Sequence, residues 1–140
     1  MYNIKIENSG GTQIRIDGKL FHLQYRFHSA IEFDEVIVFH CYPMTADGEE
    51  IKTGFTLEGR NSLFGVDKIT GACIWEMPDV EEVYPEPVSS KKVTDFVSKK
   101  HFEAYLQAFQ GRSLISVYSS ETRKLVDAIS GQILGSMEVR

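Results

Sequence analysis

The chain has 140 residues, of which 42% are hydrophobic and 25% charged. These values are typical of one globular domain with its own core, so we expect a single domain over residues 1–140. No apolar run approaches the ~20 residues that a membrane-spanning helix needs, and residues 1–5 lack the basic start and apolar stretch of a signal peptide. We therefore expect a cytoplasmic protein with no membrane partner.

The formal net charge of −5 is unevenly distributed. Residues 29–87 carry 13 acids and three bases, a net charge of −10, while the rest of the chain carries +5. An acidic region attracts a basic partner and repels phosphates, so we expect a basic protein partner and no nucleic acid. The alternative is a solvated surface on which charges happen to cluster.

The two cysteines, Cys41 and Cys73, do not form a Cys-x-x-Cys pair. In a reducing cytosol free thiols are expected, and a disulfide is the alternative. Both cysteines lie among apolar residues of predicted strands, which indicates core packing rather than chemistry.

The N-terminal part predicts antiparallel strands. Residues 14–16 alternate apolar and polar, and Asp17-Gly18 marks a tight hairpin turn because glycine tolerates positive φ. Residues 20–27 continue as a strand with one uniformly apolar face. That face consists of Phe21, Leu23, Tyr25 and Phe27.

Residues 35–42 predict a stronger strand, in which residues 36–39 are apolar throughout and so buried on both faces. Residues 43–58 form a long polar connection around Asp47-Gly48. Long connections in compact domains are usually functional or disordered, and this is the first loop in which we expect function.

Residues 62–77 predict a hairpin whose turn is closed by Asp67 and Gly71, since aspartate bonds turn amides and glycine adopts the left-handed conformation. The acidic, proline-containing residues 79–87 predict a loop. Residues 89–100 have helical spacing, whereas residues 102–109 fit either strand or helix.

Residues 114–118, 123–127 and 132–139 predict the last strands. The fold class is therefore all-β or strongly β-rich: an antiparallel meander of about eight to ten strands with at most one short helix, near Val93. The residues expected to be largely buried are Leu23, Tyr25, Val36, Val38, Phe64, Trp75, Leu114 and Val126.

Two segments match at an offset of 60 residues. Residues 66–77 and 126–137 share the pattern Val-Asp-x-Ile-(Thr/Ser)-Gly-x-x-(Ile/Leu)-x-x-Met, which indicates repeated supersecondary units. The alternative is that efficient hairpins converge on similar turns.

Residues 63–75 resemble a blade motif of quinoprotein-type β-propellers. The resemblance implies structural roles for Asp67, Gly71 and Trp75, which in that family shape the blade hairpin and pack it on its neighbour. The second copy has Gly135 and Ser136 where a tryptophan is expected. Because a closed propeller needs at least four blades, the chain is too short to form one, and no quinone cofactor is implied.

The whole chain resembles a group of small, mostly uncharacterised bacterial proteins. The resemblance rests on the strand at residues 31–38, the hairpin ending in tryptophan, and the final Asp-x-x-(Thr/Ser)-Gly-x-Ile-Leu strand. The group's hairpin pattern is Asn-Leu-Phe-x-x-Asp-x-x-Gly, to which residues 61–71 correspond as Asn-Ser-Leu-Phe-x-x-Asp-x-x-Thr-Gly. Small, acidic proteins of this kind resemble immunity proteins of bacterial competition systems.

The residues show no catalytic signature, no metal site and no cofactor motif. His40 and Cys41 are adjacent on a strand and point to opposite faces, so they cannot share a metal. His22 and His28 could share a face, with a metal site as the alternative to ordinary strand positions. Gly10-Gly11 is a turn rather than a phosphate loop.

Two acidic segments are the candidate partner-binding sites. In the first, four acids surround Tyr84, and an aromatic side chain among acids fits a basic partner. The second lies beside Asp47-Gly48. The candidate residues are Asp79, Glu81, Glu82, Tyr84, Glu86, Asp47, Glu49 and Glu50. The alternative for the first segment is a proline-stiffened, solvated linker.

These observations favour a non-enzymatic protein-binding protein, namely an immunity protein that neutralises a basic bacterial toxin. The alternative is a structural or assembly accessory protein that self-associates through exposed strand edges. An enzyme with an unrecognised site is a third class, and the sequence leaves the oligomeric state open.

Overall fold

A computed structural model describes residues 11–43, 61–86, 103–104, 106–119 and 122–138. These residues contain ten strands, which confirms the predicted β-rich meander. The strands are β1 (Gln13–Ile16), β2 (Lys19–His22), β3 (Phe27–Glu32), β4 (Val36–Cys41), β5 (Ser62–Asp67), β6 (Cys73–Met77), β7 (Glu82–Pro85), β8 (Leu114–Ser119), β9 (Thr122–Asp127) and β10 (Ile133–Glu138).

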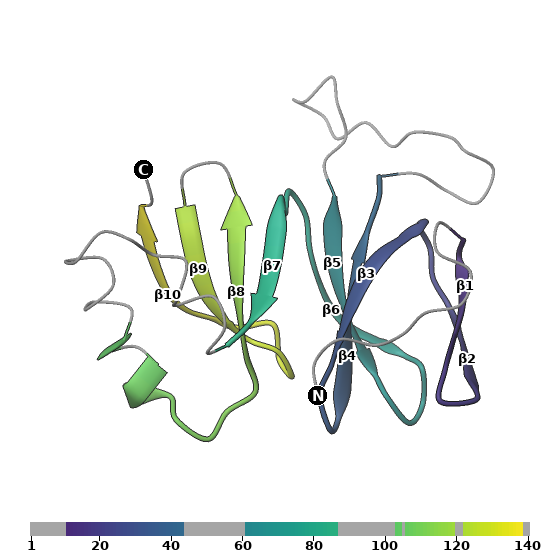
Figure 1. The fold of residues 1–140 in the computed structure, drawn as a ribbon, viewed down its shortest axis with the longest axis horizontal. Helices are drawn as coiled ribbons and strands as arrows, with labels where there is room; N and C mark the ends of the chain where they lie inside the picture. The colour runs from purple at the N-terminus through teal and green to yellow at the C-terminus, as the bar shows by residue number, and fades with distance from the viewer. Residues whose placement is uncertain (1–10, 44–60, 87–102, 105, 120–121, 139–140) are drawn as a thin grey trace.

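The ten strands form three antiparallel sheets (Figure 1). β1 and β2 form a hairpin, β3-β4-β5-β6 the first sheet, and β7-β8-β9-β10 the second sheet. Each strand pairs with its neighbour in sequence, because short turns favour antiparallel pairing of adjacent strands. Residues 103–104 and 106–108 are helical. The helix predicted over 89–100 and most of the 43–58 connection lie outside the described residues.

The two four-stranded sheets pack against each other through apolar side chains. This interface includes Val38 and Leu63 of the first sheet and Ile115, Val117 and Val126 of the second. All five are buried, and alternation along each strand directs them to one face. This interface is the central core of the molecule.

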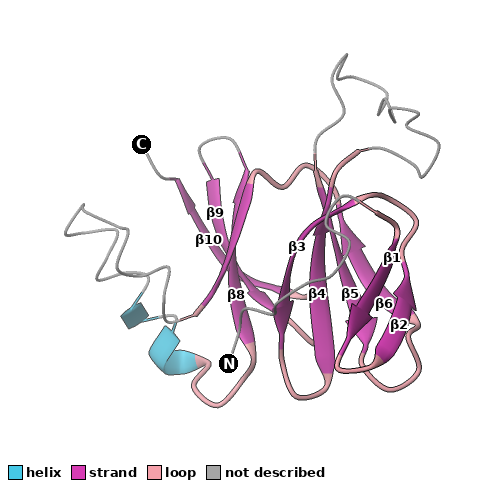
Figure 2. Ribbon diagram, turned by 45° about the vertical axis from the view of Figure 1, so that its right-hand side comes forward, coloured by secondary structure: helices cyan, strands magenta, loops and turns pink. Residues whose placement is uncertain are grey.

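Each sheet also has a second, outward face that other segments cover. The β1–β2 hairpin covers the first sheet, placing Ile14 and Phe21 against Phe39. On the second sheet, Leu106 and Phe109 from the helical region pack on a smaller apolar cluster. Figure 2 shows the hairpin and the helical residues at opposite ends of the molecule.

The predicted continuous strand over residues 20–27 is wrong. β2 ends at His22, and β3 begins at Phe27 in a different sheet. The chain must turn between them, and this turn is fixed by hydrogen bonds from Leu23 N to Thr12 O and from Phe27 N to Gly11 O. The hydrophobic alternation continues through the turn, which is why the pattern alone resembled one strand.

The predicted core is correct for most residues. Five are buried: Val36, Val38, Phe64, Leu114 and Val126. Residues 36–39 are buried on both faces, as expected. Leu23, Tyr25 and Trp75 are only half-buried and pack at the margins of the core. Cys41 is buried as predicted, but Cys73 is exposed, because β6 is the terminal strand of its sheet.

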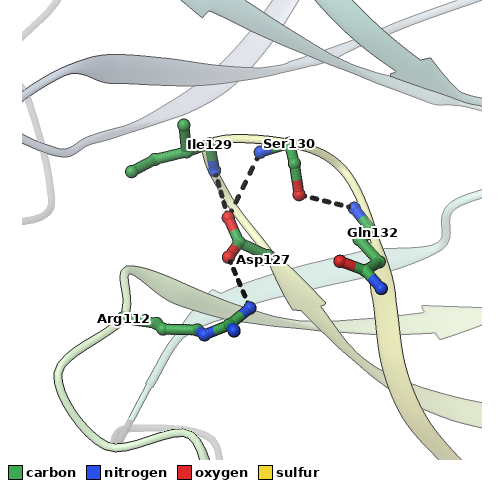
Figure 3. A network of polar contacts seen from close by, with 5 residues as sticks. All are labelled: Arg112, Asp127, Ile129, Ser130 and Gln132. Atoms are coloured by element: carbon green, nitrogen blue, oxygen red, sulfur yellow. Dashed lines mark hydrogen bonds and ion pairs between the residues drawn. The ribbon is translucent and has the colours of Figure 1, made fainter.

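The turns after β5 and β9 are built alike. Asp67 Oδ1 accepts hydrogen bonds from the amides of Ile69 and Thr70, both at 2.8 Å, and Asp127 Oδ1 accepts from Ile129 and Ser130 at 2.9 and 3.2 Å. Figure 3 shows the second turn, where Arg112 also lies 3.3 Å from Asp127 Oδ2.

Both turns close at a glycine with positive φ. Gly71 has φ 77° and Gly131 has φ 76°, a conformation that a Cβ atom disfavours. Each glycine amide donates a hydrogen bond of 2.8 Å to the carbonyl oxygen of the aspartate that begins the turn. The two hairpins thus share side-chain bonds, backbone bonds and backbone conformation.

Trp75 joins the two sheets. Its Nε1 donates a 2.9 Å hydrogen bond to Ala128 O in the turn after β9, and its ring lies where a Cβ at Gly131 would stand. Gly65 on β5 is the cross-strand neighbour of Trp75 on β6, and because Gly65 has no side chain the indole can lie over it. In the corresponding pair of the second sheet the large residue lies on the other strand: Leu125 on β9 pairs with Gly135 on β10.

Candidate functional site

Three of the predicted acids are exposed in the connection between the sheets. Asp79 and Glu81 lie between β6 and β7, and Glu82 begins β7. We call residues 78–82 the acidic connection. From residue 69 to 86 the chain contains no lysine, arginine or histidine. The acidic connection is therefore a local region of negative charge.

Hydrogen bonds to both sheets fix the backbone of the acidic connection. On the first-sheet side, Val80 N donates to Asn61 O at 2.8 Å, and Val80 is fully buried. On the second-sheet side, Glu81 N donates to Tyr118 O at 2.9 Å, and Ser119 Oγ donates to Asp79 O. The carboxylates thus extend from an anchored segment.

The loop predicted over residues 79–87 is partly a strand. Residues 82–85 form β7, in which Tyr84 pairs with Ser116 of β8. Pro85 is tolerated because β7 is an edge strand and ends there. The alternation of the strand places Glu82 and Tyr84 on one face.

Tyr84 is half-buried rather than fully exposed among the acids. Its hydroxyl donates a 3.0 Å hydrogen bond to Glu82 Oε2. Its ring meets the Tyr118 ring edge-on, with centroids 5.8 Å apart and an interplanar angle of 84°, an arrangement that aromatic pairs favour. Tyr84 thus orients Glu82.

A partner-binding residue must be accessible, and the structure contradicts this for the candidate Glu86, because its side chain is buried. Glu86 is 7% exposed and accepts a hydrogen bond from Ser116 Oγ. Arg123 Nη2 lies 3.7 Å from Glu86 Oε1, and Arg123 is fully buried. Burial lowers the pKa of Arg123, and the Glu86 carboxylate opposes that shift. A buried cation needs such a partner.

The second predicted segment, Asp47, Glu49 and Glu50, lies outside the described residues.

His40 is buried beneath the acidic connection. Its Nε2 lies 3.0 Å from Val80 O, so Nε2 carries the proton because a carbonyl only accepts. The His28 ring lies 5.0 Å from that of His40. Burial lowers the pKa of His40, and the nearby His28 adds to this effect. Neutral His40 thus helps to anchor the acidic connection.

Both thiols are held in the protonated form. Burial raises the pKa of Cys41 to about 12. Desolvation and the Glu76 carboxylate raise the pKa of Cys73. Neither thiol therefore has the low pKa of a cysteine nucleophile.

Sequence reasoning missed Arg123, Ser116 and His40 as members of this region. Arg123 alternates with Leu125 along β9, which was a signal that its side chain points inward. Nothing in the local sequence indicated that His40 would meet Val80, which lies 40 residues away. Among the described residues no group of three His, Cys, Asp or Glu side chains could hold a metal ion.

No protein-family model, curated protein or solved structure matches the chain. No helix in the described part of the chain is long and apolar enough to cross a membrane.

Proposed function

We propose that this chain is a non-enzymatic protein-binding protein that uses its acidic connection to bind a basic partner, as an immunity protein does when it neutralises a basic toxin. The observation that carries the proposal is the anchored backbone of residues 78–82, from which the Asp79, Glu81 and Glu82 carboxylates extend. Preorganised charge reduces the ordering cost of binding and speeds association with an oppositely charged surface.

The test is a pull-down from a lysate of the native cell, with the wild type and a triple variant, Asp79→Asn/Glu81→Gln/Glu82→Gln. These replacements keep the side-chain size, and asparagine tolerates the positive φ of 57° at Asp79. A basic partner should bind the wild type, should be lost as salt rises, and should not bind the triple variant.

A matched control removes the same charge elsewhere. Asp17→Asn/Asp34→Asn/Glu35→Gln changes three exposed acids, one of which, Asp17, also has positive φ. This variant should retain the partner. Equal capture by both variants would contradict the location of the surface, and the absence of a basic partner would contradict the binder proposal.

The immunity role has its own readout. Co-expression of the captured partner with the wild-type chain should restore growth that the partner alone inhibits, and the triple variant should not restore it. A partner that leaves growth unaffected would contradict the toxin but not the binding surface.

A second candidate function is self-association through strand edges. The terminal strands β6 and β10 expose Ile74 and Ile133, each 49% accessible, and an exposed edge can pair with another chain. Light scattering on the purified chain distinguishes the two functions. A monomer over the micromolar range would contradict self-association.

A further inference from the structure

A cavity of about 200 Å³ lies between the β1–β2 hairpin and the first sheet. The hairpin contributes Ile16, Asp17, Lys19 and Phe21 to its lining, and the sheet side contributes Ile37 and Lys68. The three apolar residues are almost completely buried. Two lysines and one aspartate supply its polar groups. The cavity is smaller than the ~300–1,000 Å³ of drug-sized pockets and larger than the ~150 Å³ cavity that holds benzene.

The sheet side of this cavity, formed by Ile37 and Lys68, occupies the position in the first sheet that the docking surface of Trp75 occupies in the second sheet. Ile37 pairs with Val66 just before the first turn, as Ile115 pairs with Val126 before the second. Ile37 therefore corresponds to Ile115, which belongs to the apolar cluster on which Trp75 packs.

Lys68 corresponds to Ala128, because each residue directly follows the aspartate of its turn. Lys68 N donates to Glu35 O at 3.1 Å, and Ala128 N donates to Ser113 O at 2.8 Å. Ala128 O accepts the indole N–H of Trp75. Among the described residues, no backbone amide donates a hydrogen bond to Lys68 O. The carbonyl that corresponds to Ala128 O in the first sheet thus has no such donor in the described part of the chain.

We propose that this cavity binds an aromatic ring of indole size that carries an N–H donor and an anionic group. The ring would rest on Ile37 and Phe21, and its N–H would donate to Lys68 O. The Lys68 ammonium is held by Glu32 at 2.6 Å. Lys19, whose Nζ lies 5.7 Å from the Phe21 ring centroid, is the cation that pairs with the anionic group.

The experiment titrates the ¹⁵N-labelled full chain with indole-3-acetate and follows amide chemical shifts. Shifts should concentrate on residues 16–21, 37 and 68. Naphthalene-1-acetate, which lacks the N–H, and indole-3-ethanol, which lacks the charge, should each bind more weakly. No saturable shift up to millimolar ligand would overturn the proposal, and so would shifts centred on Trp75.

Two lysine variants test the charge contribution. Lys19→Gln should weaken indole-3-acetate binding about two- to fivefold, the range of an exposed ion pair, and should leave indole-3-ethanol binding unchanged. Lys124→Gln, on β9, is the matched control and should leave both affinities unchanged. Equal weakening of both ligands by Lys19→Gln would overturn the assignment of Lys19 to the anionic group. Binding of a tryptophan-containing peptide with an equal shift pattern would identify the source as a protein side chain.

Discussion

The indole nitrogen of Trp75, on the last strand of the first sheet, donates a 2.9 Å hydrogen bond to the carbonyl oxygen of Ala128, 53 residues further along the chain. This bond ties the edge of one sheet to a turn of the other. The stability of the sheet interface should therefore depend on the indole.

We predict that Trp75→Ala lowers the free energy of unfolding by about 3–5 kcal/mol, as expected for removing a large packed aromatic side chain. Trp75→Phe keeps an aromatic ring but loses the hydrogen bond, so it should cost about 1–3 kcal/mol, because a partly buried carbonyl loses its donor and the smaller phenyl ring fills less space than the indole. Urea melts monitored by circular dichroism measure both. Ile69→Ala, at a position 82% exposed, is the control and should change stability by less than about 0.5 kcal/mol. A Trp75→Ala effect below about 1 kcal/mol would contradict the structural role.

The two turn glycines form a matched pair that isolates the contact with Trp75. Both have positive φ, so alanine at either position should cost about 1–2 kcal/mol of backbone strain. A Cβ at Gly71 meets nothing within 4 Å, whereas a Cβ at Gly131 would lie 2.6 Å from Trp75 Cγ. Gly131→Ala should therefore cost about 1–3 kcal/mol more than Gly71→Ala. Equal losses in urea melts would show that the indole does not sit tightly on the second turn.

The buried pair of Glu86 and Arg123 predicts a large effect from single removal and a small one from joint removal. Glu86→Ala leaves a buried guanidinium without this carboxylate, which should cost about 3–5 kcal/mol. The double variant Glu86→Leu/Arg123→Met should recover most of that loss, because apolar residues of similar size replace both charges. Glu82→Ala is the exposed control. Additive losses in the double variant would show that the two charges do not act as a pair.

Stability should fall on mild acidification because of His40. The pKa of His40 in the folded protein lies below its ordinary value of 6.5, so the unfolded chain takes up a proton first as the pH falls. The contribution of His40 to stability is therefore fully present above pH 6.5 and decreases as the pH falls through 6.5 toward the lowered folded pKa. Urea melts between pH 5 and 8 measure this slope, which should diminish in His40→Gln. The control His22→Gln, at an exposed strand position, should retain it.

The two thiols should differ in reactivity. In the folded protein only the exposed Cys73 should react with a thiol reagent, and slowly, because its pKa is raised. Cys41 should react only after unfolding in urea, since it is buried and its pKa is about 12. Two fast thiols in the native state would contradict the burial of β4.

The sequence was sufficient to predict most of the strands and turns because their signals are local. The alternation of residues 14–16 and the turn chemistry of Asp67 and Gly71 depend on neighbours within a few positions. The continuous strand predicted over residues 20–27 is wrong because apolar alternation does not reveal whether a chain stays in one sheet or passes to another.

The candidate site was harder to predict because its members come from distant segments. Glu86 is acidic and follows other acids, so the local pattern grouped it with an exposed surface. Only the pairing of β7 with β8, and of β8 with β9, brings it to Ser116 and Arg123, 30 or more residues away. The anchoring of the acidic connection by His40 depends on the packing of both sheets and has no local signature.

In the two corresponding cross-strand pairs, Gly65–Trp75 and Leu125–Gly135, the large residue lies on opposite strands, so the two sheets are not equivalent in how they pack on a neighbour. The first sheet extends the indole of Trp75, which pairs with Gly65, toward the second sheet. At the corresponding position the second sheet has Gly135, which pairs with Leu125 and has no side chain to extend. Packing by this device therefore runs from the first sheet to the second and does not continue beyond the second. Adding a further sheet on that side in the same way would require an aromatic side chain at position 135 together with a small residue at position 125.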